Sequence, residues 1–310
     1  MKALRLLPVV GLCLAVGFPL AGICADKVEI RQDFSKTLVY KNSWSSEYFS
    51  KRANVIDKDK ETGTVDVKHY GDWVSIEEQQ APKEGDAPGT VRIKATLQDA
   101  ESTVTEDNAK INLKNYPHVM EQLRGRAFSW RITPDGTLDQ FAPEFKTYEI
   151  SSHSLISDLH QLWMPQYRIG LPDGPVGKGD TWTSEQLIKV PINQVEKIGT
   201  VKSSSTYQIK KMKMKDGVNK AEIEEVREVQ YIGWLFSSGA SIMVDAVGGG
   251  KVKWVMDVDN GIVLSQEVKL KYDKVDVTTV DWTFEKPDEM VEDAKAKMKL
   301  EFKRKLDEIR

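Results

Sequence analysis

The stretch Leu171–Trp182, LPDGPVGKGDTW, contains the residues that most resemble a phosphate-binding loop. Such a loop follows the pattern G-x-x-x-x-G-K-[ST], in which backbone amides surround the phosphates, lysine contacts their outer oxygens and a hydroxyl binds magnesium. Counted back from the Gly-Lys pair, the first glycine position holds Pro172, and the hydroxyl position holds Gly179. Proline also removes an amide donor. We therefore interpret the stretch as a turn, in which glycine permits positive φ and Asp180 bonds nearby amides.

Two other patterns could bind a metal ion. DVDNG at 257–261 alternates carboxylates, but a calcium loop needs an acid at position 5 and a glutamate at position 12. Here those positions are Gly261 and Val268, so Asn-Gly between alternating segments predicts a hairpin instead. His153 and His160 share a helix face, but two turns separate them by about 10 Å, too far to bind one ion. No metal site and no cofactor is predicted.

No catalytic group stands out either. The sequence has no G-x-S-x-G nucleophile elbow. The acid pairs Glu77–Glu78 and Glu224–Glu225 alternate with apolar residues, as solvent-facing positions of strands do. No catalytic residue is therefore named.

The first 25 residues have the features of a secretory signal: a basic start, a long apolar run and small residues before an acid. No stop-transfer pattern follows, so no transmembrane segment is expected after removal of the signal, and the predicted location is periplasmic or secreted. Cleavage is expected near Cys24 or Ala25. Lipidation of Cys24 needs a small residue before it, and Ile23 is bulky, so the sequence argues against a lipid anchor.

The expected mature chain has no cysteine, because Cys13 and Cys24 both lie in the signal. It therefore has no disulfide and no thiolate for catalysis or metal binding. Loss of Lys2 and Arg5 takes the formal net charge from −3 to −5. This mild acidity lacks the strongly basic footprint of a nucleic-acid-binding domain.

Most of the remaining sequence alternates apolar and polar residues with a period of two. The pattern is clearest in TVRIKATLQ at 90–98, KVKWVMDVD at 251–259, SQEVKLKYDKV at 265–275 and VDWTF at 280–284. One apolar face and one charged face are typical of antiparallel strands with one face against water. The sequence predicts an all-β fold, built as one curved antiparallel sheet or as two related β units.

Two segments are predicted to be helical within this β fold. SSHSLISDLHQLW places Leu155, Leu159 and Trp163 at helical spacing behind a serine cap, which predicts an internal helix over about 151–165. The tail begins with a proline and acids, continues with lysines and has a narrow apolar stripe. These features predict a C-terminal helix over about 287–309.

A weak internal repeat suggests how the chain is divided. A glycine lies five residues before a tryptophan in both Gly125/Trp130 and Gly249/Trp254, although a shared hairpin pattern alone could produce this. The predicted organisation is a signal peptide at 1–25, an N-terminal β unit at 26–150, a helix and loop connection at 151–177, a C-terminal β unit at 178–286 and a C-terminal helix at 287–310.

LPDGPVGKGDTW, STYQIKKM and GGGKVKWVMDVDNGIV resemble an uncharacterised family of exported bacterial β-rich proteins with a GDxW-type motif. The resemblance covers about residues 120–285. It implies export and a β architecture, and it brings no activity with it. A more distant analogy is to the half-barrels closed by helices that serve as periplasmic lipid and lipoprotein carriers.

Eight tryptophans remain to be explained. They either pack in the core or line an apolar cavity between a curved sheet and a covering helix. In the second interpretation, Trp163 and Leu159 of the helix face Trp182 and Trp254 of the strands around a lipid-like ligand. The predicted function is a non-enzymatic exported envelope protein that binds an apolar ligand or a partner protein. The alternatives are a periplasmic hydrolase without a recognisable motif and a structural or assembly factor that acts through the C-terminal helix.

Overall fold

The structure is a computed structural model of the 310-residue chain. It describes residues 27–57, 60–106, 109–110, 124–134, 138–143, 168–192, 197–237, 240–281 and 291–310. The strands in these ranges are β1 Lys27–Val28, β2 Leu38–Asp57, β3 Lys60–Gln80, β4 Val91–Glu106, β5 Ala109–Lys110, β6 Ala127–Ile132, β7 Leu138–Pro143, β8 Val176–Gly177, β9 Thr181–Ile192, β10 Lys197–Lys215, β11 Val218–Ser237, β12 Ala240–Asp257, β13 Ile262–Asp281 and β14 Val291–Ile309.

One 12-stranded antiparallel sheet contains nearly all of these strands. Its order is β7-β6-β4-β3-β2-β14-β13-β12-β11-β10-β9, with β5 paired to β4 outside this path, while β1 and β8 form a separate pair. Because the last strand, β14, lies between β2 and β13, strands of the predicted N-terminal and C-terminal β units belong to one sheet. The prediction of an antiparallel β fold is confirmed for the described residues.

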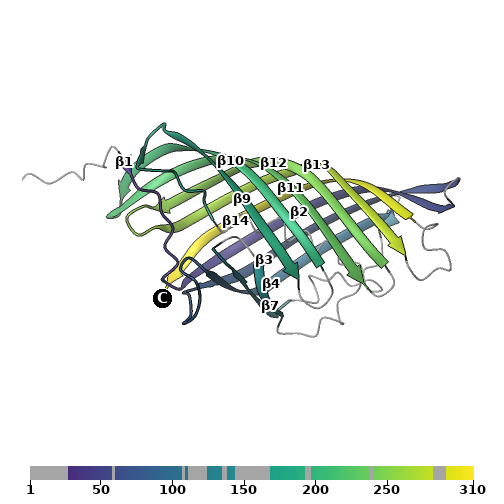
Figure 1. The fold of residues 1–310 in the computed structure, drawn as a ribbon, viewed down its shortest axis with the longest axis horizontal. Helices are drawn as coiled ribbons and strands as arrows, with labels where there is room; N and C mark the ends of the chain where they lie inside the picture. Colours follow the sequence, from purple (N-terminus) through teal and green to yellow (C-terminus); the bar gives the residue numbers. More distant parts are fainter. Residues whose placement is uncertain are drawn as a thin grey trace, which may run out of the picture.

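The sheet is long and strongly curved, so that it has a concave and a convex face (Figure 1). Its two edge strands, β7 and β9, contact each other. Register shifts at Val247/Gly248 and Tyr272/Val275 interrupt the pairing of β12, β13 and β14. Such bulges bend a strand and increase its twist, which helps the sheet to curve.

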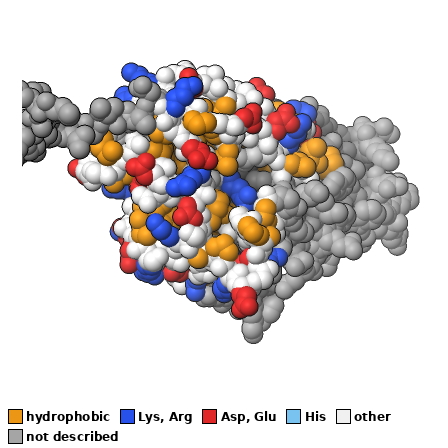
Figure 2. Space-filling view, turned by 60° about the vertical axis from the view of Figure 1, so that its left-hand side comes forward, with side chains coloured by type: hydrophobic (Ala, Val, Ile, Leu, Met, Phe, Trp, Pro, Cys, Tyr) orange, Lys and Arg blue, Asp and Glu red, His pale blue; other side chains and the backbone are white. Residues whose placement is uncertain are grey.

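Strand alternation decides which side chains face the concave side. In β11, the odd-numbered Ile223, Val229 and Tyr231 are buried, whereas the even-numbered Glu222 and Glu228 lie on the other face and are not buried. Convex-face charges form pairs across strands, such as Lys213–Glu222 and Lys299–Glu47. Figure 2 shows charges of both signs scattered among apolar side chains. Surface pairs of this kind contribute little to stability, so the fold depends on the concave face.

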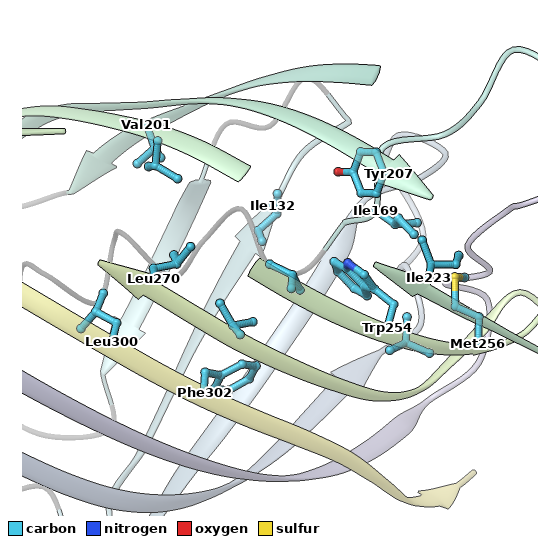
Figure 3. Close-up of a cluster of buried hydrophobic side chains, with 14 of the residues drawn as sticks. Ile132, Ile169, Val201, Tyr207, Ile223, Trp254, Met256, Leu270, Leu300 and Phe302 are labelled. Atoms are coloured by element: carbon cyan, nitrogen blue, oxygen red, sulfur yellow. The ribbon is translucent and has the colours of Figure 1, made fainter. Parts of the chain in front are cut away.

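The concave side chains of neighbouring strands form the main hydrophobic core. Figure 3 shows side chains from several strands turned toward one another inside the curve. Val201, Ile223, Trp254, Leu270 and Phe302, one from each strand from β10 to β14, are each at most 3% exposed. Burial of each such side chain contributes about 1.5–3 kcal/mol. One continuous apolar lining therefore spans at least five strands.

The predicted C-terminal helix is wrong, because residues 291–309 form strand β14. Met298, Leu300 and Phe302 are buried at a spacing of two, and lysines and a glutamate occupy the alternate positions. This period of two matches a half-buried strand between β2 and β13 and does not fit one stripe of a helix. The described residues contain no helix, so the helical part of the predicted fold class is corrected. The segment predicted as an internal helix, 151–165, lies outside the described residues.

Two segments remote in sequence lie against one end of the concave face. The N-terminal segment 27–36 and the segment 168–177 are joined by the β1–β8 pair and by a hydrogen bond from Ile169 N to Gln32 Oε1 at 3.0 Å. Arg168 donates to the carbonyl oxygens of Gly89 and Thr133, next to β4 and β6. Gln186 of β9 donates to the Arg168 carbonyl at 3.2 Å. The segment 168–177 therefore bridges the two sides of the curved sheet and closes this end.

A buried polar network joins β14 to strands near the other end of the sequence. Arg304 donates to Glu77, 227 residues away, and to Gln79 Oε1 at 3.3 Å. Asn42 Nδ2 donates to Glu77 Oε2 at 3.0 Å, and the Arg304 guanidinium carbon lies 3.7 Å from the centre of the Tyr40 ring. Burial raises the pKa of Tyr40 to about 12. Glu77, interpreted from its sequence pattern as solvent-facing, is therefore a buried residue that helps to hold β2, β3 and β14 together.

Candidate functional site

Two glycines of β12, Gly248 and Gly250, share the concave face with a polar site formed by β11 and β13. Gly250 pairs with Arg227 of β11 and Leu270 of β13, and Gly248 pairs with Tyr272 of β13. A Cβ added to Gly250 would lie 1.9 Å from the Lys269 carbonyl oxygen, and one added to Gly248 would lie 2.7 Å from Tyr272 Cδ1. Glycine is therefore required for the close approach of the neighbouring backbone, and the Tyr272 ring packs over Gly248.

Beside these glycines, β11 carries a fully buried ion pair. Glu225 and Arg227 are 0% and 1% exposed, and being two residues apart they share the concave face. Arg227 Nε donates to Glu225 Oε1 at 2.5 Å, and Nη2 donates to Oε2 at 2.9 Å. Ser205 Oγ and Trp254 Nε1 donate to the same carboxylate at 2.7 and 2.8 Å. Four donors therefore satisfy the Glu225 carboxylate, as a buried charge requires.

The electrostatics keep Arg227 charged in spite of its burial. Burial by itself would lower the pKa of Arg227, but the charge and hydrogen bonds of Glu225 outweigh it, so that the pKa is raised. Burial raises the pKa of Tyr272 well above its ordinary value, and the nearby Arg227 opposes this only in part. At neutral pH Arg227 is therefore charged and Tyr272 keeps its hydroxyl proton.

Two polar groups of this site have no hydrogen-bond partner among the described residues: Arg227 Nη1 and the Tyr272 hydroxyl, both of which are buried. Arg227 Nη1 carries two N–H donors, and the Tyr272 hydroxyl can donate or accept. Unpaired buried donors are rare and costly in folded proteins. These groups can therefore bind an oxygen acceptor within the apolar lining.

A second polar cluster joins this site to the closed end. Gly170 N donates to the Tyr207 hydroxyl at 3.1 Å, and Trp182 Nε1 donates to the Gly170 carbonyl at 2.8 Å. The rings of Trp182 and Tyr207 stack with centroids 5.1 Å apart. Burial raises the pKa of Tyr207 to about 12, and the charge of Glu225 acts in the same direction. This cluster fixes Gly170 against β9 and β10, so we assign it a structural role.

Two of the four predicted ligand-binding residues, Trp182 and Trp254, lie in the described part of the chain. Trp254 lies on the concave face, 1% exposed, and donates to Glu225. Trp182 is partly buried and packs against the same core. Trp163 and Leu159 lie outside the described residues. The structure therefore brings two of the four residues to one apolar core, and the binding role of all four stays a prediction.

Sequence reasoning missed Glu225, Arg227 and Tyr272. The sequence pattern predicts that Glu225 faces solvent like Glu224, and this prediction is wrong because Glu225 is 0% exposed. A signal was present: Ile223, Glu225 and Arg227 share a parity with the apolar residues of β11. Parity therefore predicts these charges inside, but it does not predict their partners.

The two motifs interpreted as turns are turns in the structure. Gly179 has φ 91°, and Gly177 N donates to Asp180 Oδ2 at 2.9 Å, so GPVGKGD leads into β9 as predicted. DNG at 259–261 connects β12 to β13, and Gly261 has φ 67°. Neither motif gains a binding role from its geometry.

A shallow hollow on the convex face is the other candidate. It is lined by a mixture of polar, charged and apolar residues: Ser43, Trp44, Ser45, Asp72, Val74, Asp99, Glu301 and Lys303. The part of the chain that the structure describes contains no group of three or more His, Cys, Asp or Glu side chains suited to a metal ion. In the described ranges, no helix is long and apolar enough to span a membrane.

Comparisons with known proteins add architecture alone. No family model and no curated protein matches the sequence, so the resemblance to an exported bacterial family has no support from a family match. A structure of lipovitellin, determined for its lipid–protein interactions, is similar with a TM-score of 0.40 and 10% identity over 91% of this chain; the match spans 26% of the lipovitellin chain. Pseudomonas aeruginosa OpdQ is similar with a TM-score of 0.20 and 10% identity, over 86% of this chain and 98% of OpdQ. Both likenesses are distant and concern β-rich architecture.

Proposed function

We propose that the protein is a non-enzymatic, exported envelope protein that binds an apolar ligand on the concave face of its curved sheet. The observation that carries the proposal is the continuous apolar lining from β10 to β14, closed at one end by the segment 168–177. Binding sites of this kind are mostly apolar, with a few placed polar groups that orient the ligand. Glu225, Arg227 and Tyr272 are such groups.

Export is supported by the composition of residues 1–25, which resembles a secretory signal. The proposal expects the protein in the periplasm or the medium, with Ala25 or Asp26 as its first residue. N-terminal sequencing of protein recovered from each fraction tests this. Recovery of a chain that still begins at Met1 from the cytoplasm would contradict it. The alternative of an assembly factor that acts through a C-terminal helix is withdrawn, because those residues form β14.

The experiment that tests ligand binding compares two tryptophan substitutions on adjacent residues of β13. Leu270 points into the core and is 3% exposed, whereas the Lys269 side chain is 58% exposed. If the concave face receives a ligand, Leu270→Trp occupies that space and abolishes binding of a neutral fluorescent apolar probe, while the melting temperature is preserved. Lys269→Trp should leave both properties unchanged.

A solid core gives a different result. In that case the wild-type protein binds no probe, and Leu270→Trp loses about 1–3 kcal/mol through overpacking. Native mass spectrometry of the purified protein, with lipid extraction, then shows only the mass of the chain. This pair of results would remove the ligand-binding proposal and leave the fold.

A further inference from the structure

Two polar groups in the apolar lining indicate the chemistry of the bound ligand. Arg227 Nη1 and the Tyr272 hydroxyl are buried and lack partners among the described residues, although Nε and Nη2 of the same guanidinium each donate to Glu225. On the concave face, Ser205 stands opposite Arg227, while Leu270 and Met298 beside Tyr272 are apolar and buried. What these two groups accept as a partner therefore defines the polar end of the ligand.

Geometry places the two groups around the glycines of β12. Arg227 stands opposite Gly250, and Tyr272 stands opposite Gly248, so that no side chain of β12 separates them. Nη1 brings two N–H donors and the hydroxyl brings one O–H donor. Each group can donate to an oxygen acceptor such as a carbonyl.

Charge decides which kind of oxygen fits. Glu225 already compensates the charge of Arg227 in a two-point contact, and both side chains are buried. A ligand carboxylate or phosphate would add a second negative charge that no described cation of the site balances, and an unbalanced buried charge is strongly disfavoured. A neutral carbonyl or hydroxyl oxygen would satisfy the same donors without that penalty.

We infer that Arg227 and Tyr272 recognise the neutral oxygen of an uncharged lipid, such as an ester carbonyl, and that the site discriminates against ionised fatty acids of the same chain length. This inference rests on the proposed function, because it names the ligand class of the same apolar face. Apolar contacts along β10 to β14 would hold the chain of the lipid, and the two donors would fix its polar end.

The test uses three ligands of equal chain length: dodecane, methyl dodecanoate and dodecanoate at pH 8, where the acid is ionised. Each displaces a neutral fluorescent apolar probe from the purified protein. Methyl dodecanoate is expected to bind about tenfold more tightly than dodecane, the factor that one net hydrogen bond of ordinary strength supplies. Dodecanoate is expected to bind more weakly than its methyl ester.

Two tyrosine variants assign the preference to the site. Tyr272→Phe keeps the ring over Gly248 and removes only the hydroxyl, so the preference for the ester over dodecane should fall by several-fold while dodecane binding is unchanged. Tyr40→Phe is the matched control, because Tyr40 is a buried tyrosine on β2 in the separate Arg304 network. It should keep the full preference. Circular dichroism melts establish that both variants fold, and if Tyr272→Phe does not, the ranking of the three ligands by the wild-type protein decides.

Each contrary result has its own meaning. Equal binding of dodecane and the ester, tightest binding of dodecanoate, or an unchanged preference in Tyr272→Phe overturns the inference and leaves an apolar-ligand protein whose polar groups bind water. Absence of binding by dodecane and by the probe overturns the proposed function, and the inference falls with it.

Discussion

Removal of Arg227 tests whether the charged pair of β11 is as buried and as fully bonded as the structure describes. In Arg227→Met the Glu225 carboxylate keeps its hydrogen bonds from Ser205 and Trp254 and loses two of its four donors, together with its counter-charge. Breaking a buried pair by removing one partner costs about 3–5 kcal/mol. We expect the free energy of unfolding to fall by that amount.

A second substitution, Glu225→Leu, completes a double-mutant cycle. Glu225→Leu alone leaves the Arg227 guanidinium buried without a counter-charge, and it should be destabilising to a similar degree. The double variant removes both charges and leaves only the Ser205 hydroxyl and the Trp254 N–H unpaired, at about 1–3 kcal/mol each. It should therefore cost clearly less than the sum of the two single variants, with a coupling energy on the order of 3 kcal/mol.

Urea unfolding followed by circular dichroism supplies the free energies, and tryptophan fluorescence supplies a second probe of the same transition. Lys253→Met is the control, because Lys253 is an exposed charge on the convex face of the neighbouring strand β12. It should change stability by no more than about 0.5 kcal/mol. A loss below about 1 kcal/mol in Arg227→Met, or additive single variants, would refute the reasoning, because an exposed pair behaves in that way.

Three further predictions concern other parts of the sheet. Gly250→Ala should lower the free energy of unfolding by at least about 1–3 kcal/mol, because its Cβ would collide with backbone, whereas Gly174→Ala, in open space, should not; equal effects in thermal melts would contradict this. Hydrogen bonds, above all from Arg92, hold the pKa of Asp86 well below its usual range. The ionised carboxylate therefore stabilises the fold at pH values above its unfolded pKa of about 4. This stabilisation is lost as the pH falls from there through the folded pKa. The difference in melting temperature between wild type and Asp86→Asn should therefore shrink below about pH 4, and a constant difference would be inconsistent with the ion pair. Burial raises the pKa of Tyr207 from 10.0 to about 12, so the stabilisation by its protonated hydroxyl is complete below pH 10 and is lost as the pH rises toward 12. Between these pH values, the free energy of unfolding measured by urea titration should fall less in Tyr207→Phe than in wild type. An equal fall in both proteins would count against burial of Tyr207.

The antiparallel β character could be predicted from the sequence, because the period-two alternation of β4, β12 and β13 matches their alternation of buried and less buried side chains. Strand β14 shows how the prediction of a helix arose. Its order of acids before lysines matches a helix dipole and predicts a helix, whereas Met298, Leu300 and Phe302, buried at alternate positions, follow the period of a strand. Charge order is a weak preference worth tenths of a kcal/mol, whereas burying one face of the strand is worth several. Burial of one strand face therefore outweighs the charge order, and the segment forms a strand.

The polar groups inside the sheet could be predicted only in part. Parity alone places Glu225 and Arg227 on the buried face of β11, and Gly248–Gly250 indicates a close approach of neighbouring strands. The partners of these residues depend on strand order, which alternation does not determine. The contact between Arg304 and Glu77 joins residues 227 positions apart, and no local pattern reports such a pair.

The buried charges also help to fix the register in which the long strands pair. Strand β11 has 20 residues, and its apolar positions repeat every two. A slip of two residues against β10 or β12 would keep the apolar residues inside, so hydrophobic burial by itself specifies the register weakly. Such a slip would move the Glu225 carboxylate away from Ser205 and Trp254, which lie on the two neighbouring strands. A buried carboxylate that loses its donors is costly, so this register is favoured over its neighbours. Glu225 is then explained by the fold alone. Arg227 Nη1 and the Tyr272 hydroxyl have no hydrogen-bond partner among the described residues, so they do not fix the register in this way, and in the proposed function they are the groups that bind the ligand.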